Sequence, residues 1–237
     1  IKYLVGTVDP ELPNLERDKK RPVYSFANGV LACETGRFHL YGDPELEAYR
    51  TRVAVKYFET DMPEEALHMP PFDSREAEDY DWFEELPTPA FDQVIKLQFE
   101  EEEVQKWMFI MLGRLMYQVK SCDKWEVMIF LKGVAGSGKS TIGKVAQKFF
   151  NPEDVGVMSN NIEKKFGLSS MMDADLVVCL EAKQDLGVDQ AELQSMITGE
   201  DMCIPIKMKT AQVLTWKSPI LMCGNELPGW VDKQGSM

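Results

Sequence analysis

The sequence predicts an α/β fold, in which a parallel sheet with flanking helices follows a smaller, mixed α+β region. From residue 127 onward, short apolar, β-prone runs alternate with helix-forming stretches, a pattern typical of parallel α/β proteins. Between residues 23 and 40, three short apolar runs are separated by turn residues, including Asn28-Gly29, which indicates a hairpin. We expect a β-rich region at 1–60, an acidic, proline-rich linker at 61–89, a packing helical region at 90–126 and the α/β core at 127–237.

The negative charge of the chain is concentrated in one segment. The 237 residues carry a formal net charge of −13. Residues 59–103 contain 16 acidic residues, against only Arg75 and Lys96. Residues 131–237 are nearly balanced, with 11 basic and 13 acidic residues. The overall acidity therefore leaves room for a local basic surface in the α/β core.

The cysteines and histidines give no sign of a metal centre in the sequence. The five cysteines are scattered and form no C-x-x-C pair, so we expect reduced thiols rather than disulfides or zinc ligands. His39 and His68 lack ligand-like neighbours, and we expect no catalytic role for either. No stretch approaches 18 apolar residues and the N-terminus does not resemble a signal peptide, which predicts a soluble, intracellular protein with no membrane partner.

A phosphate-binding loop lies at the start of the α/β core. Residues 133–140 fit the pattern G-x-x-x-x-G-K-[ST], after an apolar strand and before a helix expected at 142–150. The glycines allow backbone N–H groups to point toward a phosphate, and the helix N-terminus adds partial positive charge. Lys139 is expected to contact the β- and γ-phosphates, and Ser140 to coordinate Mg²⁺. The predicted nucleotide-binding residues are Gly133, Val134, Ala135, Gly136, Ser137, Gly138, Lys139 and Ser140.

The elements around this loop follow from apolar periodicity. Residues 88–120 have helical spacing and are expected to pack on the core. After the loop helix we expect a strand at 155–158 and a small helix at 161–166. The next apolar run, 176–181, ends in Glu181. A Walker B strand likewise ends in an acidic residue, which brings a carboxylate to Mg²⁺ or to water.

The last third of the chain contains three further elements of interest. A helix is expected at 190–198, followed by two strands at 202–206 and 212–215 that form a hairpin. Lys207 and Lys209 lie near the tip of this hairpin. A buried strand at 219–225 ends on Asn225, whose amide can hold a water or a γ-phosphate, or can simply begin the next turn.

Taken in order, these motifs resemble the superfamily 3 helicases of DNA viruses. The chain looks most like the primase–helicase proteins of nucleocytoplasmic large DNA viruses and related phages, from about residue 23 to the end. The resemblance rests on the phosphate-binding loop, the strand ending in Glu181, residues 198–201 (Thr-Gly-Glu-Asp), the lysine-tipped hairpin and residues 224–228 (Gly-Asn-Glu-Leu-Pro). Residues 26–36 and 87–92 resemble the segments that precede the helicase in that family.

The resemblance implies an AAA+-like ATPase that forms a homo-oligomeric ring, usually hexameric, and translocates on single-stranded DNA. Lys139, Ser140 and Thr141 would hold ATP and Mg²⁺, with Glu181 as the Walker B acid and Asn225 as the sensor. Lys209, with Lys207 beside it, would enter the central channel and contact DNA. The implied setting is viral DNA replication in the host cytoplasm or nucleus, with other replication proteins as partners.

Two departures from that family pattern bear on hydrolysis. Many members have paired acids at Walker B, whereas Ala182 follows Glu181, so that either Glu181 acts alone or another acid such as Asp185 contributes. No arginine follows Arg114, although this class needs one from a neighbouring subunit. We expect that the chain is a fragment that stops before this arginine.

Two other functions are compatible with a phosphate-binding loop. A nucleotide-gated DNA-binding or assembly module with little hydrolysis is favoured by Ala182. A small-molecule kinase is disfavoured, because such kinases close an arginine-bearing lid over the phosphates and residues 115–237 contain no arginine.

Overall fold

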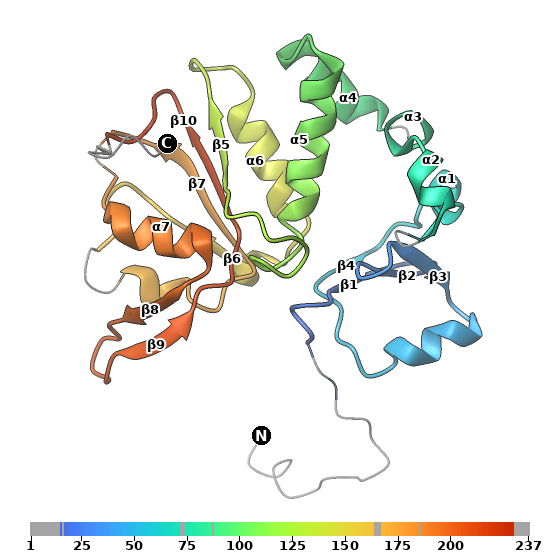
Figure 1. Ribbon diagram of the computed structural model, residues 1–237, viewed down its shortest axis with the longest axis horizontal. Coiled ribbons are helices and arrows are strands. Elements are labelled where there is room, and N and C mark those ends of the chain that lie inside the picture. The colour runs from blue at the N-terminus through green and yellow to red at the C-terminus, as the bar shows by residue number, and fades with distance from the viewer. Residues whose placement is uncertain are drawn as a thin grey trace, which may run out of the picture. The chain divides into compact units, whose positions relative to one another are not determined.

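The computed structural model describes residues 15, 17–71, 74–86, 88–163, 167–184 and 186–229 (Figure 1). It divides into two compact units, Ile1–Leu86 (unit 1) and Pro87–Met237 (unit 2). Within the described ranges, no helix has the length and apolar character needed to cross a membrane.

Unit 1 contains a four-stranded sheet with the order β3-β2-β1-β4. Strands β1, β2 and β3 pair antiparallel, and β4 pairs parallel with β1. Val23 and Tyr24 contribute the buried side chains of β1. The strands are β1 (Val23–Phe26), β2 (Gly29–Ala32), β3 (Arg37–Leu40) and β4 (Tyr57–Phe58), which confirms the small hairpin-rich sheet predicted at 23–40.

Four short helices follow strands β3 and β4 in the sequence. A 3₁₀ helix, η1 (Pro44–Tyr49), follows β3 and is capped by Asp43, whose side chain accepts a hydrogen bond from the Glu45 N–H. Three helices of four residues each lie in the acidic segment, where carboxylates in the first turn favour helix initiation. They are α1 (Glu64–Leu67), α2 (Glu76–Asp79) and α3 (Trp82–Glu85).

Unit 2 is built on an all-parallel sheet with the order β5-β10-β7-β6. All five residues of β10 and the first four of β7 are buried, as expected for central strands covered on both faces. The strands are β5 (Ile129–Lys132), β6 (Val155–Val157), β7 (Leu176–Ala182) and β10 (Ile220–Gly224). The predicted α/β fold with a parallel sheet and a preceding mixed region is confirmed (Figure 1).

The remaining elements of the core lie close to the predicted positions. The helices are α6 (Lys139–Gln147) and α7 (Gln190–Thr198), with 3₁₀ turns η2 (Pro152–Asp154) and η3 (Gly167–Ser170). Strands β8 (Asp201–Ile204) and β9 (Gln212–Thr215) form a separate antiparallel hairpin. The small helix expected at 161–166 is absent from its described part, residues 161–163, and the other three residues lie outside the described ranges.

The region predicted to be helical at 88–120 does contain helices, but they are two and they end at Arg114. Two helices occupy it, α4 (Pro89–Gln98) and α5 (Glu102–Arg114), and the chain is extended at Phe99 between them. The buried side chain of Gln105 donates a hydrogen bond of 2.8 Å to the Phe99 carbonyl, which holds the break in place. Lys120, beyond α5, has a left-handed backbone with φ of 64°, which ends any helical continuation.

Candidate functional site

The glycine-rich turn connects β5 to α6 through two left-handed glycines. Gly136 and Gly138 have φ values of 80° and 81°, a conformation that other residues rarely adopt. Gly138 is the N-cap of α6, and its carbonyl accepts hydrogen bonds from the N–H groups of Thr141 and Ile142. The Gly133 N–H donates to the Gly224 carbonyl over 3.2 Å, which ties the start of the turn to the end of β10.

Lys139 is the residue around which the turn folds. Its ammonium group donates to the carbonyls of Gly133 and Val134, each at 2.7 Å, and to the Ser137 hydroxyl at 3.3 Å. It also lies 3.2 Å from Oδ1 of Asn225, which directly follows β10. Two residues predicted separately, from opposite ends of the core sequence, are therefore in direct contact.

A cavity of about 710 Å³ opens where the carboxyl ends of the parallel strands meet. Parallel strands all end at the same edge of a sheet, so residues that follow β5, β7 and β10 converge there. Four predicted catalytic or metal residues line it together: Lys139, Ser140, Glu181 and Asn225. The full lining is Ala135, Gly136, Lys139, Ser140, Leu180, Glu181, Ala182, Lys183, Gln184, Gly224, Asn225 and Glu226.

The donor set in the cavity suits Mg²⁺ with a polyphosphate. Ser140 supplies a hydroxyl oxygen and Glu181 a carboxylate, and both side chains are exposed. Magnesium typically takes one or two such protein oxygens and completes its shell with phosphate and water. The other predicted loop residues, Gly133, Val134, Ser137, Gly138 and Thr141, support the turn or begin α6 and do not line the cavity.

The strand geometry explains why position 182, next to Glu181, holds an alanine and not a second acid. Successive residues of a strand point to opposite faces, and here Glu181 is exposed whereas Ala182 is 5% exposed, within the hydrophobic core. A carboxylate at position 182 would be desolvated by that core. Asp185, the other candidate acid, lies outside the described residues.

Three residues in or next to the cavity, Asn160, Gln184 and Glu226, were not anticipated from the sequence. The side chain of Asn160 donates to the Glu181 carbonyl and accepts a hydrogen bond of 2.9 Å from the Lys183 N–H. Asn160 thus fixes the backbone on both sides of Ala182. Gln184 donates a short hydrogen bond to the Glu226 carboxylate, another pair at the cavity. Asn160 lies three residues after β6, a strand with a single buried residue, so the signal that singled out Asn225, a polar residue directly after a buried strand, does not apply to it.

The buried thiol of Cys223 lies directly beneath the loop helix. Its sulfur is 3.7 Å from the Lys139 carbonyl, to which it donates from within β10. Burial, with a smaller contribution from neighbouring Cys179, raises the pKa of the Cys223 thiol to about 11. Cys223 therefore remains a neutral thiol that packs and donates, as predicted for the core cysteines.

The two lysines predicted to bind DNA lie apart from the cavity. Lys207 and Lys209 are exposed in the connection between β8 and β9. Met208 between them has φ of 60° and a side chain that is 96% exposed. This tip carries three long side chains on a hairpin whose strand β8 packs Met202 and Ile204 into the core.

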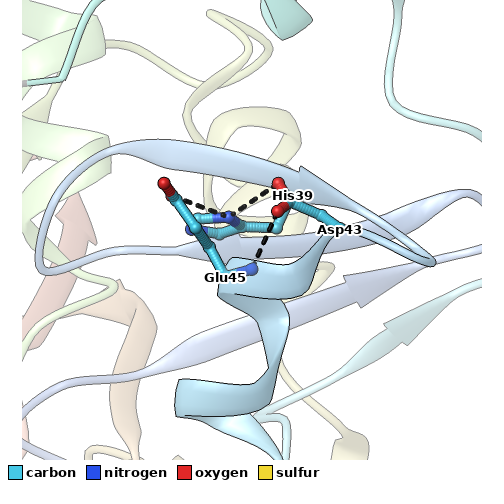
Figure 2. A group of neighbouring side chains, drawn as sticks. All are labelled: His39, Asp43 and Glu45. Carbon is cyan, nitrogen blue, oxygen red and sulfur yellow. Dashed lines mark hydrogen bonds and ion pairs between the residues drawn. The ribbon is translucent and has the colours of Figure 1, made fainter.

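The expectation that His39 lacks ligand-like neighbours is wrong. Asp43 and Glu45 approach its imidazole in unit 1, as Figure 2 shows. Within β3, His39 is buried whereas its neighbour Leu40 is 49% exposed.

The fold and the site together define an α/β protein with a strand, a glycine-rich loop and a helix at the edge of a parallel sheet. Residues 131–236 match a family model described as a family of unknown function, DUF5906. No curated protein matches the chain.

The chain is also similar to solved structures, among them structures of the NrS-1 C-terminal region. An apo structure of the NrS-1 C-terminal region is 15% identical, with a TM-score of 0.44, and the match covers 90% of this chain and 56% of that one. An A-form apo structure of the same region is 17% identical, with a TM-score of 0.45, and coverage of 87% and 54%. The chain spans about half the length of these two structures.

Proposed function

We propose that the chain is the ATPase motor of a DNA helicase in viral DNA replication, which binds ATP and Mg²⁺ in the cavity and translocates on single-stranded DNA. The observation that carries this proposal is the convergence of Lys139, Glu181 and Asn225 on one cavity, with Lys139 hydrogen-bonded to Asn225. A phosphate-contacting cation, a carboxylate and a neutral amide are the groups that phosphoryl transfer to water requires.

Each cavity residue has a distinct role in this proposal. Lys139 exchanges its carbonyl partners for the β- and γ-phosphate oxygens, while the backbone amides of the loop residues that line the cavity, Ala135, Gly136, Lys139 and Ser140, surround the phosphates. Glu181 accepts a proton from the attacking water, and Asn225 orients that water or the γ-phosphate. Ser140 and Glu181 would hold Mg²⁺, which supplies charge neutralisation at the phosphates.

DNA binding is assigned to the β8–β9 hairpin. Lys207 and Lys209 are exposed at its tip and hold no acidic partner among the described residues. In a homo-oligomeric ring, hexameric as the family resemblance implies, these tips would gather into a basic track in spite of the net charge of −13. Other replication proteins are then expected partners of the assembly.

The proposal is tested by ATP hydrolysis with and without single-stranded DNA at low salt, together with the binding of both ligands. Lys139→Ala should abolish nucleotide binding. Lys209→Ala should weaken DNA binding and lower its salt dependence by about one counterion, with unchanged nucleotide affinity. Lys217→Ala is the matched control, because Lys217 is exposed beyond β9 and away from the tip. Equal effects of the two lysine variants would remove the hairpin assignment.

One observation favours a second function, that of a nucleotide-gated DNA-binding or assembly module. Ala182 leaves Glu181 without a neighbouring acid on the strand, and Asn160 holds Ala182 inward through the backbone. Binding of ATP and DNA without DNA-stimulated turnover would support this module and contradict the motor.

A further inference from the structure

We infer that unit 1 binds a divalent transition-metal ion between His39, Asp43 and Glu45. His39 comes from β3, Asp43 caps η1, and Glu45 lies in the first turn of η1. One potential ligand atom from each of the three residues lies within 4.8 Å of the other two. Figure 2 shows both carboxylates directed toward the same imidazole nitrogen.

The spacing fits ligands around an ion better than it fits a hydrogen bond. Nδ1 of His39 is 3.4 Å from Oδ2 of Asp43 and 3.9 Å from Oε2 of Glu45. Strong hydrogen bonds between such groups are about 2.7–3.2 Å long. Ligand atoms about 2.0–2.1 Å from a tetrahedral ion lie roughly 3.4 Å from one another. A small closure of the Glu45 side chain, which is 58% exposed and pairs with Arg37 through the same Oε2, would complete that arrangement.

Hydrogen bonding accounts for only one ring nitrogen of His39, because Nδ1 has a long contact of 3.4 Å with Asp43. His39 is 3% exposed, and its ring lies 5.2 Å from the ring of Tyr49. The second ring nitrogen, Nε2, is buried, and none of the described residues forms a hydrogen bond with it. Most buried polar groups do have a partner, so this histidine is kept at a cost in stability. A role for Nδ1 as a metal ligand explains why that cost is tolerated.

One contact of the two carboxylates favours a metal centre and another opposes it. Oδ1 of Asp43 is held by the Glu45 N–H at 2.8 Å, which leaves Oδ2 directed at the histidine. Such outer contacts are typical of ligating carboxylates. Arg37 lies 2.6 Å from Oε2 of Glu45 and places a positive charge beside the site. Because this charge opposes a cation, Arg37 should limit the affinity without abolishing binding.

The ligand atoms indicate the class of metal. One imidazole nitrogen with carboxylate oxygens suits Zn²⁺, Co²⁺ or Mn²⁺ rather than Cu⁺, which prefers sulfur, or Ca²⁺, which prefers oxygen alone. Water would fill the remaining positions. The ion would join β3 to η1 and so stabilise unit 1.

The test is a Co²⁺ titration of the 237-residue chain without nucleotide, followed by visible absorption, which separates nitrogen and oxygen ligands from cysteine thiolates. One saturable site without a thiolate band is expected. Glu45→Gln should weaken binding at least tenfold, and the exposed position of Glu45 keeps the fold intact. Arg37→Gln should tighten binding, because it removes the opposing charge.

Glu47→Gln is the matched control, because Glu47 lies in the same helix, is 73% exposed and pairs only with Arg50 among the ion pairs of the described residues. It should leave Co²⁺ affinity unchanged. The inference is overturned if no saturable binding occurs, in which case the cluster is an ion pair only. It is also overturned if Co²⁺ binding survives Glu45→Gln but is lost in Glu181→Gln, which would place the ion in unit 2.

Discussion

In unit 1, the three proposed metal ligands lie within residues 39–45, because β3 runs directly into η1. In unit 2, Lys139 and Asn225 are 86 positions apart in the sequence and yet 3.2 Å apart in space, because parallel strands are separated by long crossovers. The first site therefore depends on the local register of one hairpin. The second depends on interactions that hold the ends of distant strands together.

The largest expected effect is a loss of stability in unit 1, caused by a substitution that separates β2 from β3, the strand that carries His39. A Cβ at Gly29 would collide with the His39 carbonyl and lie 2.7 Å from Cε1 of Phe38. Gly29→Ala should therefore lower the free energy of unfolding of unit 1 by about 3 kcal/mol, because β2 must move away from β3. Urea denaturation with hydrogen exchange of the β1–β3 amides measures this loss.

Gly113→Ala is the control for that substitution. Gly113 lies within α5, and a Cβ there would meet no atom within 4 Å. Alanine should stabilise this helix by up to about 1 kcal/mol. If Gly29→Ala is as stable as Gly113→Ala, the register of the hairpin does not depend on the close approach at Gly29.

An intermediate effect is expected from loosening the distant site at Asn160. Asn160→Ala removes both hydrogen bonds that hold the backbone around Ala182, so Glu181 loses its fixed position. We expect the rate of ATP hydrolysis to fall about tenfold, which is roughly 1.4 kcal/mol, with little change in ATP affinity. Steady-state kinetics with a separate measurement of nucleotide binding distinguish the two quantities.

Asn151→Ala provides the comparison, because Asn151 also borders β6 but bonds to Asp154, away from the cavity. It should leave hydrolysis unchanged. A loss of ATP affinity in Asn160→Ala as large as the loss of rate would indicate a structural role for Asn160 and would remove the positioning assignment.

The smallest effect is expected for a local ion pair within unit 2. Arg114 holds Asp123 with two hydrogen bonds of 2.6 and 2.8 Å, and these lower the pKa of the Asp123 carboxyl. Because the folded pKa lies below the unfolded one, the pair stabilises the protein above the unfolded pKa and loses this effect as the pH falls through the folded value. Asp123→Asn should therefore cost about 1 kcal/mol at pH 7.

Denaturation at pH 7 and at about pH 2 measures this difference, which should shrink at the acidic pH. Asp61→Asn serves as the control, because Asp61 is exposed and no ion pair of the described residues involves it. A cost at Asp123 that does not vary with pH would show that the side chain acts by shape rather than by charge.

The contrast between the two sites also explains what the sequence could predict. The strand, turn and helix around Lys139 follow from local signals, and α7 lies where periodicity placed it. The convergence with Asn225 follows from the rule that parallel strands end at one edge. Side-chain partners across that edge, such as Asn160 with Glu181, have no local signal.

The side-chain neighbours of His39 could not be predicted from the sequence. No local signal shows that the chain turns after β3 and brings Asp43 and Glu45 back to the imidazole of His39. The break at Phe99 was missed for a similar reason. It is held by a buried glutamine whose spacing still fits a helix.

The position of Cys223 means that the rate of its alkylation reports how often α6 separates from the sheet. Thiols react as thiolates, and a fully buried group with a pKa of about 11 is neither ionised nor accessible at neutral pH. An alkylating reagent can reach it only during the moments when α6 separates from β10. Cys203 is exposed and reacts without any such event. A ligand that holds α6 on the sheet would therefore slow the modification of one cysteine and leave that of the other unchanged.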